Sequence, residues 1–244
     1  MSDWNSQARV AAAGQADMAM DAGLRGFMLG VFNKMALGLA LSAALAYVVG
    51  SNEALALTLL TGPLGLVVRF GPLAILLISA FAMRNPSPVG ANLVYWSVTA
   101  LIGVSLGSIV MIYGRSMDGM VIVAKAFFIT AASFGALSLW GYTTKRDLTG
   151  FGTFLIMGLF GLIIASLVNL FLHSSALSFA ISVIGVLVFA GLTAWDTQRL
   201  KHLYYQVGGD ARATSVMTTY GALNLYLDFI NLFLFILRLL SPRN

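Results

Sequence analysis

Two aspartates stand in segments that are otherwise apolar enough to cross a bilayer. Asp196 lies in the segment LTAWDTQ, and Asp228 lies in the segment LYLDFIN. An ionised side chain at the centre of a membrane helix costs about 2.5–3.5 kcal/mol on insertion scales, so packing alone rarely accounts for one. The pair is therefore the first candidate for a functional site, and its chemistry is the binding of protons or cations.

Two carboxyl groups at one depth in a dry bundle cannot both ionise at low cost. We therefore expect the pair to share one proton and to titrate as a unit. The two groups hydrogen-bond to each other while they share the proton, and they repel each other when both are charged. Two states of this kind suit a gate. For Asp196 there is a structural alternative, because Arg199 follows at i+3 and can form an interfacial ion pair. Asp228 has uncharged residues on both sides.

Aromatic residues at the membrane boundary indicate the depth of the two carboxyl groups. Tyr204 follows Asp196 by eight residues, and Tyr220 precedes Asp228 by eight residues. If both tyrosines lie at the headgroup level of the inner side, each aspartate lies about 12 Å below it on antiparallel neighbouring helices. The two carboxyl groups are thus predicted to hydrogen-bond across these helices.

The elements that must position these residues are those of an integral membrane protein. The chain is 59% hydrophobic and 9% charged, and its mean hydropathy is +0.89, whereas about a quarter of the residues in soluble domains are charged. The net charge is +5, but the basic residues are scattered singly, so we expect no nucleic-acid binding. The absence of cysteine excludes disulfides, thiol nucleophiles and cysteine metal sites.

Seven segments satisfy the requirement of about 20 apolar residues for one crossing. The uncharged run 148–195 is too long for one crossing, so we divide it at a turn formed by His173, Ser174 and Ser175. Arg69 interrupts the second segment, and we expect the Gly-Pro pairs at 62–63 and 71–72 to break it near the membrane surface. The segments are 27–49, 64–83, 85–114, 120–142, the two halves of 148–195, and 218–240.

The distribution of basic residues sets the expected orientation. Most of the 14 basic residues fall on the side of the N-terminus when the seven segments alternate, which predicts a cytoplasmic N-terminus. We assign residues 1–25 to a cytoplasmic tail and residues 26–244 to an all-helical transmembrane domain. Lys34 and Lys125 lie within segment ends, and we expect their side chains to extend to the interface, with a pore-lining role as the alternative.

Two sequence blocks resemble a known family. The block AGLTAWDTQ at 190–198 and the block GALNLYLDFINLF at 221–233 resemble the Bax inhibitor-1 family of membrane proteins, and DAGLR at 21–25 resembles its bacterial members. The resemblance covers essentially the whole chain. It implies a seven-helix bundle in which the sixth helix is wrapped by the others, and a calcium-leak activity gated by pH.

The resemblance also implies roles for individual residues. A di-aspartyl pH sensor in the family matches Asp196 and Asp228, and an arginine at the end of the second helix matches Arg84. By position alone, Arg84 is either a charge partner of the aspartates or a flanking residue that obeys the positive-inside rule.

A permeant cation needs oxygen ligands along its path. Calcium takes about six to eight of them, and the two carboxyl groups can supply only a loose, partly hydrated site. We therefore expect weak binding of calcium or protons at Asp196 and Asp228, with Asn224, Asn231 and Tyr226 as polar lining. Apart from the permeant ion, we expect no cofactor.

The sequence thus favours a pH-sensitive calcium leak channel gated by a di-aspartyl proton switch, and no enzymatic activity. An alternative is a non-transporting regulator that binds another membrane protein, such as a membrane protease. A minor alternative is an intramembrane aspartyl protease, in which two aspartates also share a proton, but the Gly-x-Gly-Asp block of those enzymes is absent. We expect the chain to lie in the lipid bilayer of a bacterial inner membrane.

Overall fold

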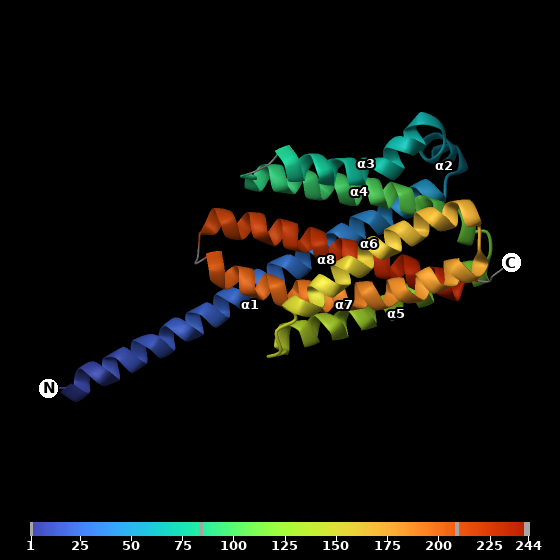
Figure 1. Ribbon diagram of the computed structural model, residues 1–244. Helices are drawn as coiled ribbons and strands as arrows, with labels where there is room; N and C mark the ends of the chain where they lie inside the picture. The colour runs from blue at the N-terminus through green and yellow to red at the C-terminus, as the bar shows by residue number, and fades with distance from the viewer. Residues whose placement is uncertain (1, 83–84, 208–209, 242–244) are drawn as a thin grey trace.

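The computed structural model is all helical over the residues it describes, which are 2–82, 85–207 and 210–241, with side chains for 22–81, 85–207 and 210–241. Seven helices in this part of the chain are long and apolar enough to cross a membrane, which confirms the predicted number of crossings. The helices, shown in Figure 1, are α1 (Ser2–Gly50), α2 (Glu53–Leu60), α3 (Gly62–Ala82), α4 (Pro88–Tyr113), α5 (Met117–Thr143), α6 (Thr149–Leu172), α7 (Ser175–Val207) and α8 (Ala211–Leu240).

The turn predicted within the long uncharged run is present between α6 and α7. His173 ends α6 with a φ of 50°, in the left-handed region, where many helices terminate. The Ser174 N–H donates to Oδ1 of Asn169 at 3.1 Å, and α7 begins at Ser175. The run therefore makes two antiparallel crossings.

A short helix, α2, connects the first two crossings, and the apolar pattern does not predict it. It starts after Asn52, whose side chain accepts a hydrogen bond from the Leu55 N–H at 3.1 Å. The chain then turns sharply at Gly62, which has a φ of 60° that favours glycine. Arg69 Nη2 donates to the Leu60 carbonyl oxygen at 3.5 Å. The charge that interrupts the second apolar segment thus supports the end of α2.

The break expected at residues 71–72 is absent, so that prediction was wrong. Pro72 lies inside α3, which continues to Ala82. Membrane helices tolerate an internal proline because neighbouring groups and local adjustments satisfy the freed carbonyl. A Cβ atom on Gly71 would lie 3.0 Å from Leu101 Cδ1 of α4. Here glycine allows two helices to pack closely and does not end one.

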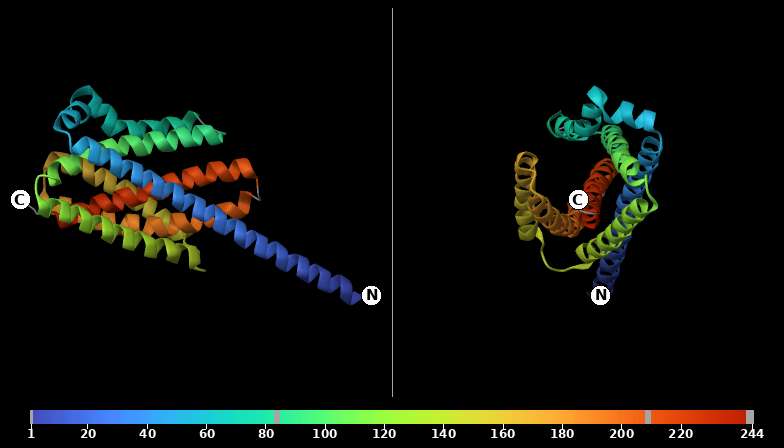
Figure 2. Two further views of the ribbon diagram at one scale, coloured as in Figure 1. Left: turned by 180° about the vertical axis from the view of Figure 1, so that it is seen from behind. Right: turned by 90° about the vertical axis from the view of Figure 1, so that its right-hand side faces the viewer.

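α7 and α8 form the interior of the bundle. Of the most apolar 18-residue stretch of each helix, 56% is buried inside the protein in α8 and 39% in α7, whereas 11% is buried in α6. α7 packs along α8 and is covered by α5 and α6, while α1 packs along α4 and α3 covers α4 (Figure 2). The family resemblance implies that the sixth crossing, α7, is the central helix. The structure shows that the seventh crossing, α8, is more enclosed than α7. Both aspartates lie on the two innermost helices.

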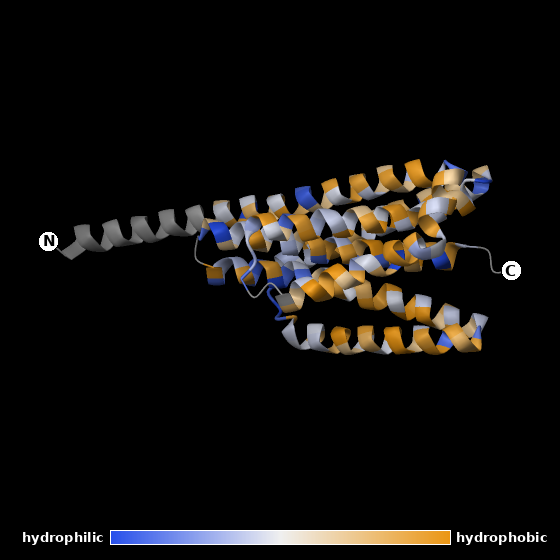
Figure 3. Ribbon diagram, turned by 90° about the horizontal axis from the view of Figure 1, so that it is seen from above, coloured by the Kyte–Doolittle hydropathy of each residue, from blue (hydrophilic) through white to orange (hydrophobic). Residues whose placement is uncertain are grey.

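The bundle has two polar ends with an apolar middle. Hydrophilic residues gather toward the ends and hydrophobic residues lie between them (Figure 3). We call the end that contains the α5–α6 and α7–α8 connections the inner end, in keeping with the predicted orientation, and the opposite end the outer end. α1 runs without a break through residue 25, so the predicted boundary between tail and transmembrane domain does not coincide with a helix end.

α5 and α7 approach closely at Gly141, where a Cβ atom would overlap the backbone carbonyl of Ala194. Gly135 on the same helix faces open space. We predict that Gly141→Ala lowers the free energy of unfolding by about 1–3 kcal/mol through overpacking. The matched variant Gly135→Ala should be neutral or stabilising. Thermal unfolding in detergent measures the difference, and equal midpoints for the two variants would contradict this close approach.

Candidate functional site

The site consists of two buried carboxyl groups that touch. Asp196 on α7 and Asp228 on α8 hydrogen-bond to each other through their side chains, and only 8% and 5% of their surfaces are exposed. Oδ2 of Asp228 is buried and has no hydrogen-bond partner among the described residues. A carboxyl group donates to another only if it carries a proton. A direct hydrogen bond between the two groups is therefore possible only when one of them carries a proton.

Two glycines on α7 and α8 bracket this contact. On the outer side, a Cβ atom on Gly185 of α7 would lie 2.7 Å from the Phe235 ring of α8. On the inner side, a Cβ atom on Gly221 of α8 would lie 2.6 Å from Leu200 of α7. Neither position has room for a larger residue without movement of a neighbour. The two helices are thus held close on both sides of the aspartates.

The hydroxyl groups of α7 near the pair are already satisfied within their own helix. Thr193 Oγ1 donates to the Phe189 carbonyl at 2.8 Å, and Thr197 Oγ1 donates to the Thr193 carbonyl at 2.7 Å. Both threonines are fully buried. They therefore leave the hydrogen bonding at Asp196 to Asp228 and to a cation.

That cation is Arg199. Its Nη1 lies 3.8 Å from Asp196 Oδ1, and its side chain is 51% exposed. Its guanidinium carbon also lies 5.3 Å from the centroid of the Trp195 ring. The ion pair offered as a structural alternative for Asp196 therefore coexists with the carboxyl contact. An ion pair with a half-exposed arginine is weak, so it leaves Asp196 free to respond to Asp228.

Arg84, the predicted charge partner, lies outside the described residues. Its pairing with the aspartates stays a prediction. Arg199, which sequence reasoning treated as a competitor of the pair, is the arginine that contacts it among the described residues.

None of the three residues predicted as polar lining forms a hydrogen bond with the pair in the described part of the chain. Asn224 is exposed. Tyr226 is fully buried, and its hydroxyl shares a hydrogen bond of 2.7 Å with Ser42 Oγ, which donates to the Thr99 carbonyl at 2.8 Å. Tyr226 thus joins α8 to α1 and α4 on the side of α8 that faces away from α7. Asn231 Nδ2 donates to its own helix at the Leu227 carbonyl.

Asn231 also lines a cavity of about 580 Å³ between α6, α7 and α8 near the outer end. Other polar residues of this cavity are Asn169, Ser178 and Arg238, and Asn169 Nδ2 donates to Ser178 Oγ at 2.7 Å. Asn231 lies about one helical turn outward of Asp228 on the same face of α8. The cavity therefore leads from the outer end toward the carboxyl pair.

A second polar cluster, centred on Lys34, joins α1, α4 and α8. Lys34 Nζ donates to Asn92 Oδ1 at 2.6 Å and to Thr219 Oγ1 at 2.7 Å. It lies 5.8 Å from the centroid of the Tyr95 ring. Two partners on other helices thus hold the Lys34 ammonium group. Its extension to the interface stays a prediction, and Lys125 is exposed.

A third polar contact fixes the connection next to the site. Gln198 is buried; its Oε1 accepts from the Leu148 N–H at 2.9 Å, and its Nε2 donates to the Arg146 carbonyl at 2.7 Å. Within the α5–α6 connection, the Thr149 hydroxyl and then its backbone N–H donate hydrogen bonds to the Asp147 carboxyl. These bonds lower the pKa of Asp147 below its ordinary value. Gln198 thereby anchors the α5–α6 connection two residues from Asp196.

The arrangement restricts the chemistry of the site. No group of three or more histidine, aspartate or glutamate side chains that could hold a metal ion is present in the described part of the chain. What the pair offers is proton exchange and, once the proton is lost, brief contact with a passing cation.

Known proteins match this chain over nearly its full length. Residues 24–244 match the family model described as Inhibitor of apoptosis-promoting Bax1. The chain is 55% identical over 248 residues to an uncharacterized protein of Caulobacter vibrioides, with 97% of each chain covered. It is 45% identical over 225 residues to uncharacterized protein RP147 of Rickettsia prowazekii, covering 91% of this chain and 92% of the relative. It is 42% identical over 226 residues to the inner membrane protein YbhL of Escherichia coli K12, covering 91% and 94%.

The Lys34 cluster makes a prediction about stability. Lys34→Met removes a cation that holds α4 and α8 to α1, and we expect the free energy of unfolding to fall by about 1.5–3 kcal/mol, as for hydrogen bonds to a charged group. Lys125→Met, at an exposed position, should change it by less than about 0.5 kcal/mol. Denaturant titration in detergent compares the two. If both variants are as stable as the wild type, the Lys34 contacts do not hold the helices together.

Proposed function

The chain belongs to the Bax inhibitor-1 family, and we propose that it is a pH-sensitive leak channel for calcium, gated by the proton shared between Asp196 and Asp228. The observation that supports this most directly is the contact between two buried carboxyl groups on the two innermost helices. The role needs no covalent chemistry, so we propose no enzymatic activity. The Escherichia coli relative is named an inner membrane protein, and we place this chain in the inner membrane of a bacterium.

The arrangement around the pair fits a closed state. From the outer end, the cavity reaches Asn231, one turn from Asp228. From the inner end, half-exposed Arg199 reaches Asp196. Between these two approaches lie the carboxyl pair and the close packing of α7 on α8 at Gly185 and Gly221. The pair thus lies where a gate has to lie.

Loss of the shared proton supplies the energy to open this gate. Two unit charges about 4 Å apart repel by about 4 kcal/mol at an effective dielectric constant of about 20. A change of this size is enough to shift a protein between two conformations that differ by a few kcal/mol.

A channel of this kind passes calcium without storing it. Two carboxylates provide at most part of the six to eight oxygen ligands that calcium takes. Tyr226 is bonded to Ser42 and Asn224 is exposed, so we expect water to supply the remaining ligands. Weak, partly hydrated coordination allows the ion to leave as readily as it enters.

We predict that the purified protein in lipid vesicles passes calcium. The flux should be lowest where the pair holds one shared proton. It should change sigmoidally over about two pH units near neutrality as that proton is lost. Asp228→Asn should flatten this profile more than Asp196→Asn, because Asp228 is the more buried and has no arginine partner among the described residues. Calcium-dye flux measured from pH 5 to about pH 9 gives the profiles.

Asp118→Asn is the matched control, because Asp118 is an exposed aspartate at the start of α5; its profile should match that of the wild type. If neither substitution in the pair alters the profile, the two aspartates are structural and do not gate the flux. If the wild type passes no cation at any pH, the non-transporting regulator becomes the better account.

A further inference from the structure

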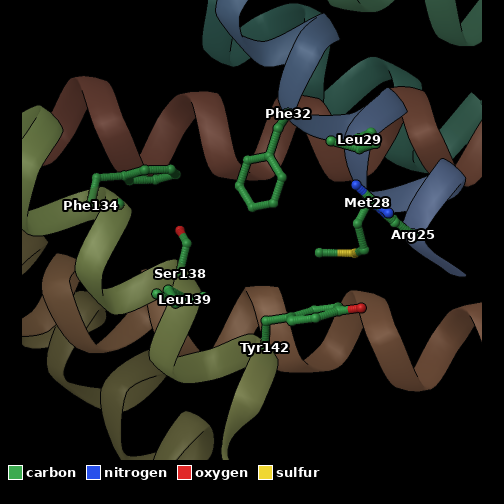
Figure 4. A pocket seen from close by; sticks show the side chains of 9 residues that line it. Arg25, Met28, Leu29, Phe32, Phe134, Ser138, Leu139 and Tyr142 are labelled. Carbon is green, nitrogen blue, oxygen red and sulfur yellow. The ribbon is translucent and has the colours of Figure 1, made fainter. Parts of the chain in front are cut away.

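A groove on the membrane face of the bundle separates α1 from α5. No Cα atoms of these two helices approach within 8 Å of one another in the described residues. A cavity of about 460 Å³ fills the gap, lined on α1 by Arg25, Met28 and Phe32 and on α5 by Phe134 and Tyr142, among others. The carboxyl pair does not line it. In Figure 4 the Phe134 ring lies toward one end of the groove, and Arg25 lies toward the other.

The groove faces the region that lipid occupies. Its rim is formed by Leu29 and Leu139, which are 51% and 65% exposed, and both helices are membrane spans. Apolar side chains line its middle, as Figure 4 shows for Met28 and Phe32. A hydrocarbon chain is the species available at this depth of a bilayer. The volume also falls within the range of about 300–1,000 Å³ that ligand pockets have.

The inner mouth of the groove carries positive charge. Arg25 is exposed there and forms no ion pair with a described residue. Lys201 Nζ lies 5.5 Å from the centroid of the Tyr142 ring and donates to the Tyr142 carbonyl at 3.3 Å. Two cations thus flank the end at which a lipid headgroup would lie. Basic pockets between membrane helices on the cytoplasmic side are suited to acidic headgroups.

Inside the groove, a buried hydroxyl lacks a partner. Ser138 is 4% exposed, and its Oγ makes no hydrogen bond within the described residues. Thr130 on the same helix donates to the Ala126 carbonyl at 2.7 Å, the usual solution for a hydroxyl in a membrane helix. The Ser138 hydroxyl points into the cavity instead (Figure 4).

The depth of Ser138 suits a lipid ester. It lies one turn, about 6 Å, deeper than Tyr142 along α5. The ester carbonyls of a glycerophospholipid lie just below its phosphate, so a phosphate beside Arg25 brings an ester oxygen to this level. The unsatisfied donor and the two cations therefore match successive groups of one molecule.

We propose that the α1–α5 groove binds one acidic phospholipid, with its phosphate at Arg25, an ester carbonyl accepting from Ser138 Oγ, and an acyl chain along Met28, Phe32 and Phe134. The site is separate from the carboxyl pair. It lies where no Cα atoms of α1 and α5 come within 8 Å of one another in the described residues.

Native mass spectrometry of the full-length protein tests the proposal. The protein in detergent is titrated with dioleoyl-phosphatidylglycerol or with dioleoyl-phosphatidylcholine, and retained lipid is counted. We expect one phosphatidylglycerol to be retained roughly ten-fold more strongly than phosphatidylcholine, because both carry the phosphate but only phosphatidylcholine adds a choline cation, which Arg25 and Lys201 repel. Arg25→Gln should bring this ratio close to one, whereas Arg212→Gln, at an exposed arginine of the inner end, should leave it unchanged.

A second pair of variants tests the groove itself. Gly135→Leu should abolish retention of both lipids, because Gly135 lines the cavity and an added side chain there meets open space and not the protein. Gly161→Leu, which also meets open space but lies on α6, should retain lipid as the wild type does. Unchanged thermal midpoints of both variants show that the fold is intact.

Three results would overturn the proposal. They are equal retention of the two lipids by the wild type, equal losses in the Gly135 and Gly161 variants, and a photo-reactive residue at position 135 that captures a second copy of the chain in place of phospholipid.

Discussion

The contact between two buried carboxyl groups, Asp196 on α7 and Asp228 on α8, is the interaction on which the rest of the structure depends. An uncompensated carboxylate in a dry interior costs several kcal/mol, and Asp228 has no cation beside it among the described residues. Asp196 meets that need only while the two helices stay close. The tight packing at Gly185 and Gly221 on either side of the pair is therefore a condition for burying Asp228 at all.

The remaining polar contacts hold the bundle around this pair. The Lys34 cluster and the Tyr226–Ser42 contact join α8 to α1 and α4, and Gln198 fixes the α5–α6 connection to α7. Because each contact has α7 or α8 as one partner, separation of the two aspartates strains the surrounding helices as well. At the groove between α1 and α5 the backbones of the two helices stay more than 8 Å apart in the described residues, and a bound lipid would fill that gap.

The sequence predicts what depends on composition and spacing. The number of crossings follows from apolar lengths, and the shared depth of Asp196 and Asp228 follows from their equal distances to Tyr204 and Tyr220. Partnerships across helices are harder to predict, because they depend on rotation about each helix axis. The partners of Lys34 therefore went unrecognised. Which helix is innermost is equally hidden, since lipid-facing and buried residues are both apolar in a membrane.

Infrared spectroscopy of the carboxyl C=O stretch tests the shared proton most directly. The other acidic side chains that the structure describes are exposed. We predict a protonated-carboxyl band that persists at neutral pH and disappears at higher pH. In both Asp196→Asn and Asp228→Asn this band should be lost or should titrate differently. A spectrum without such a band at neutral pH, or a band that neither substitution changes, would contradict the account.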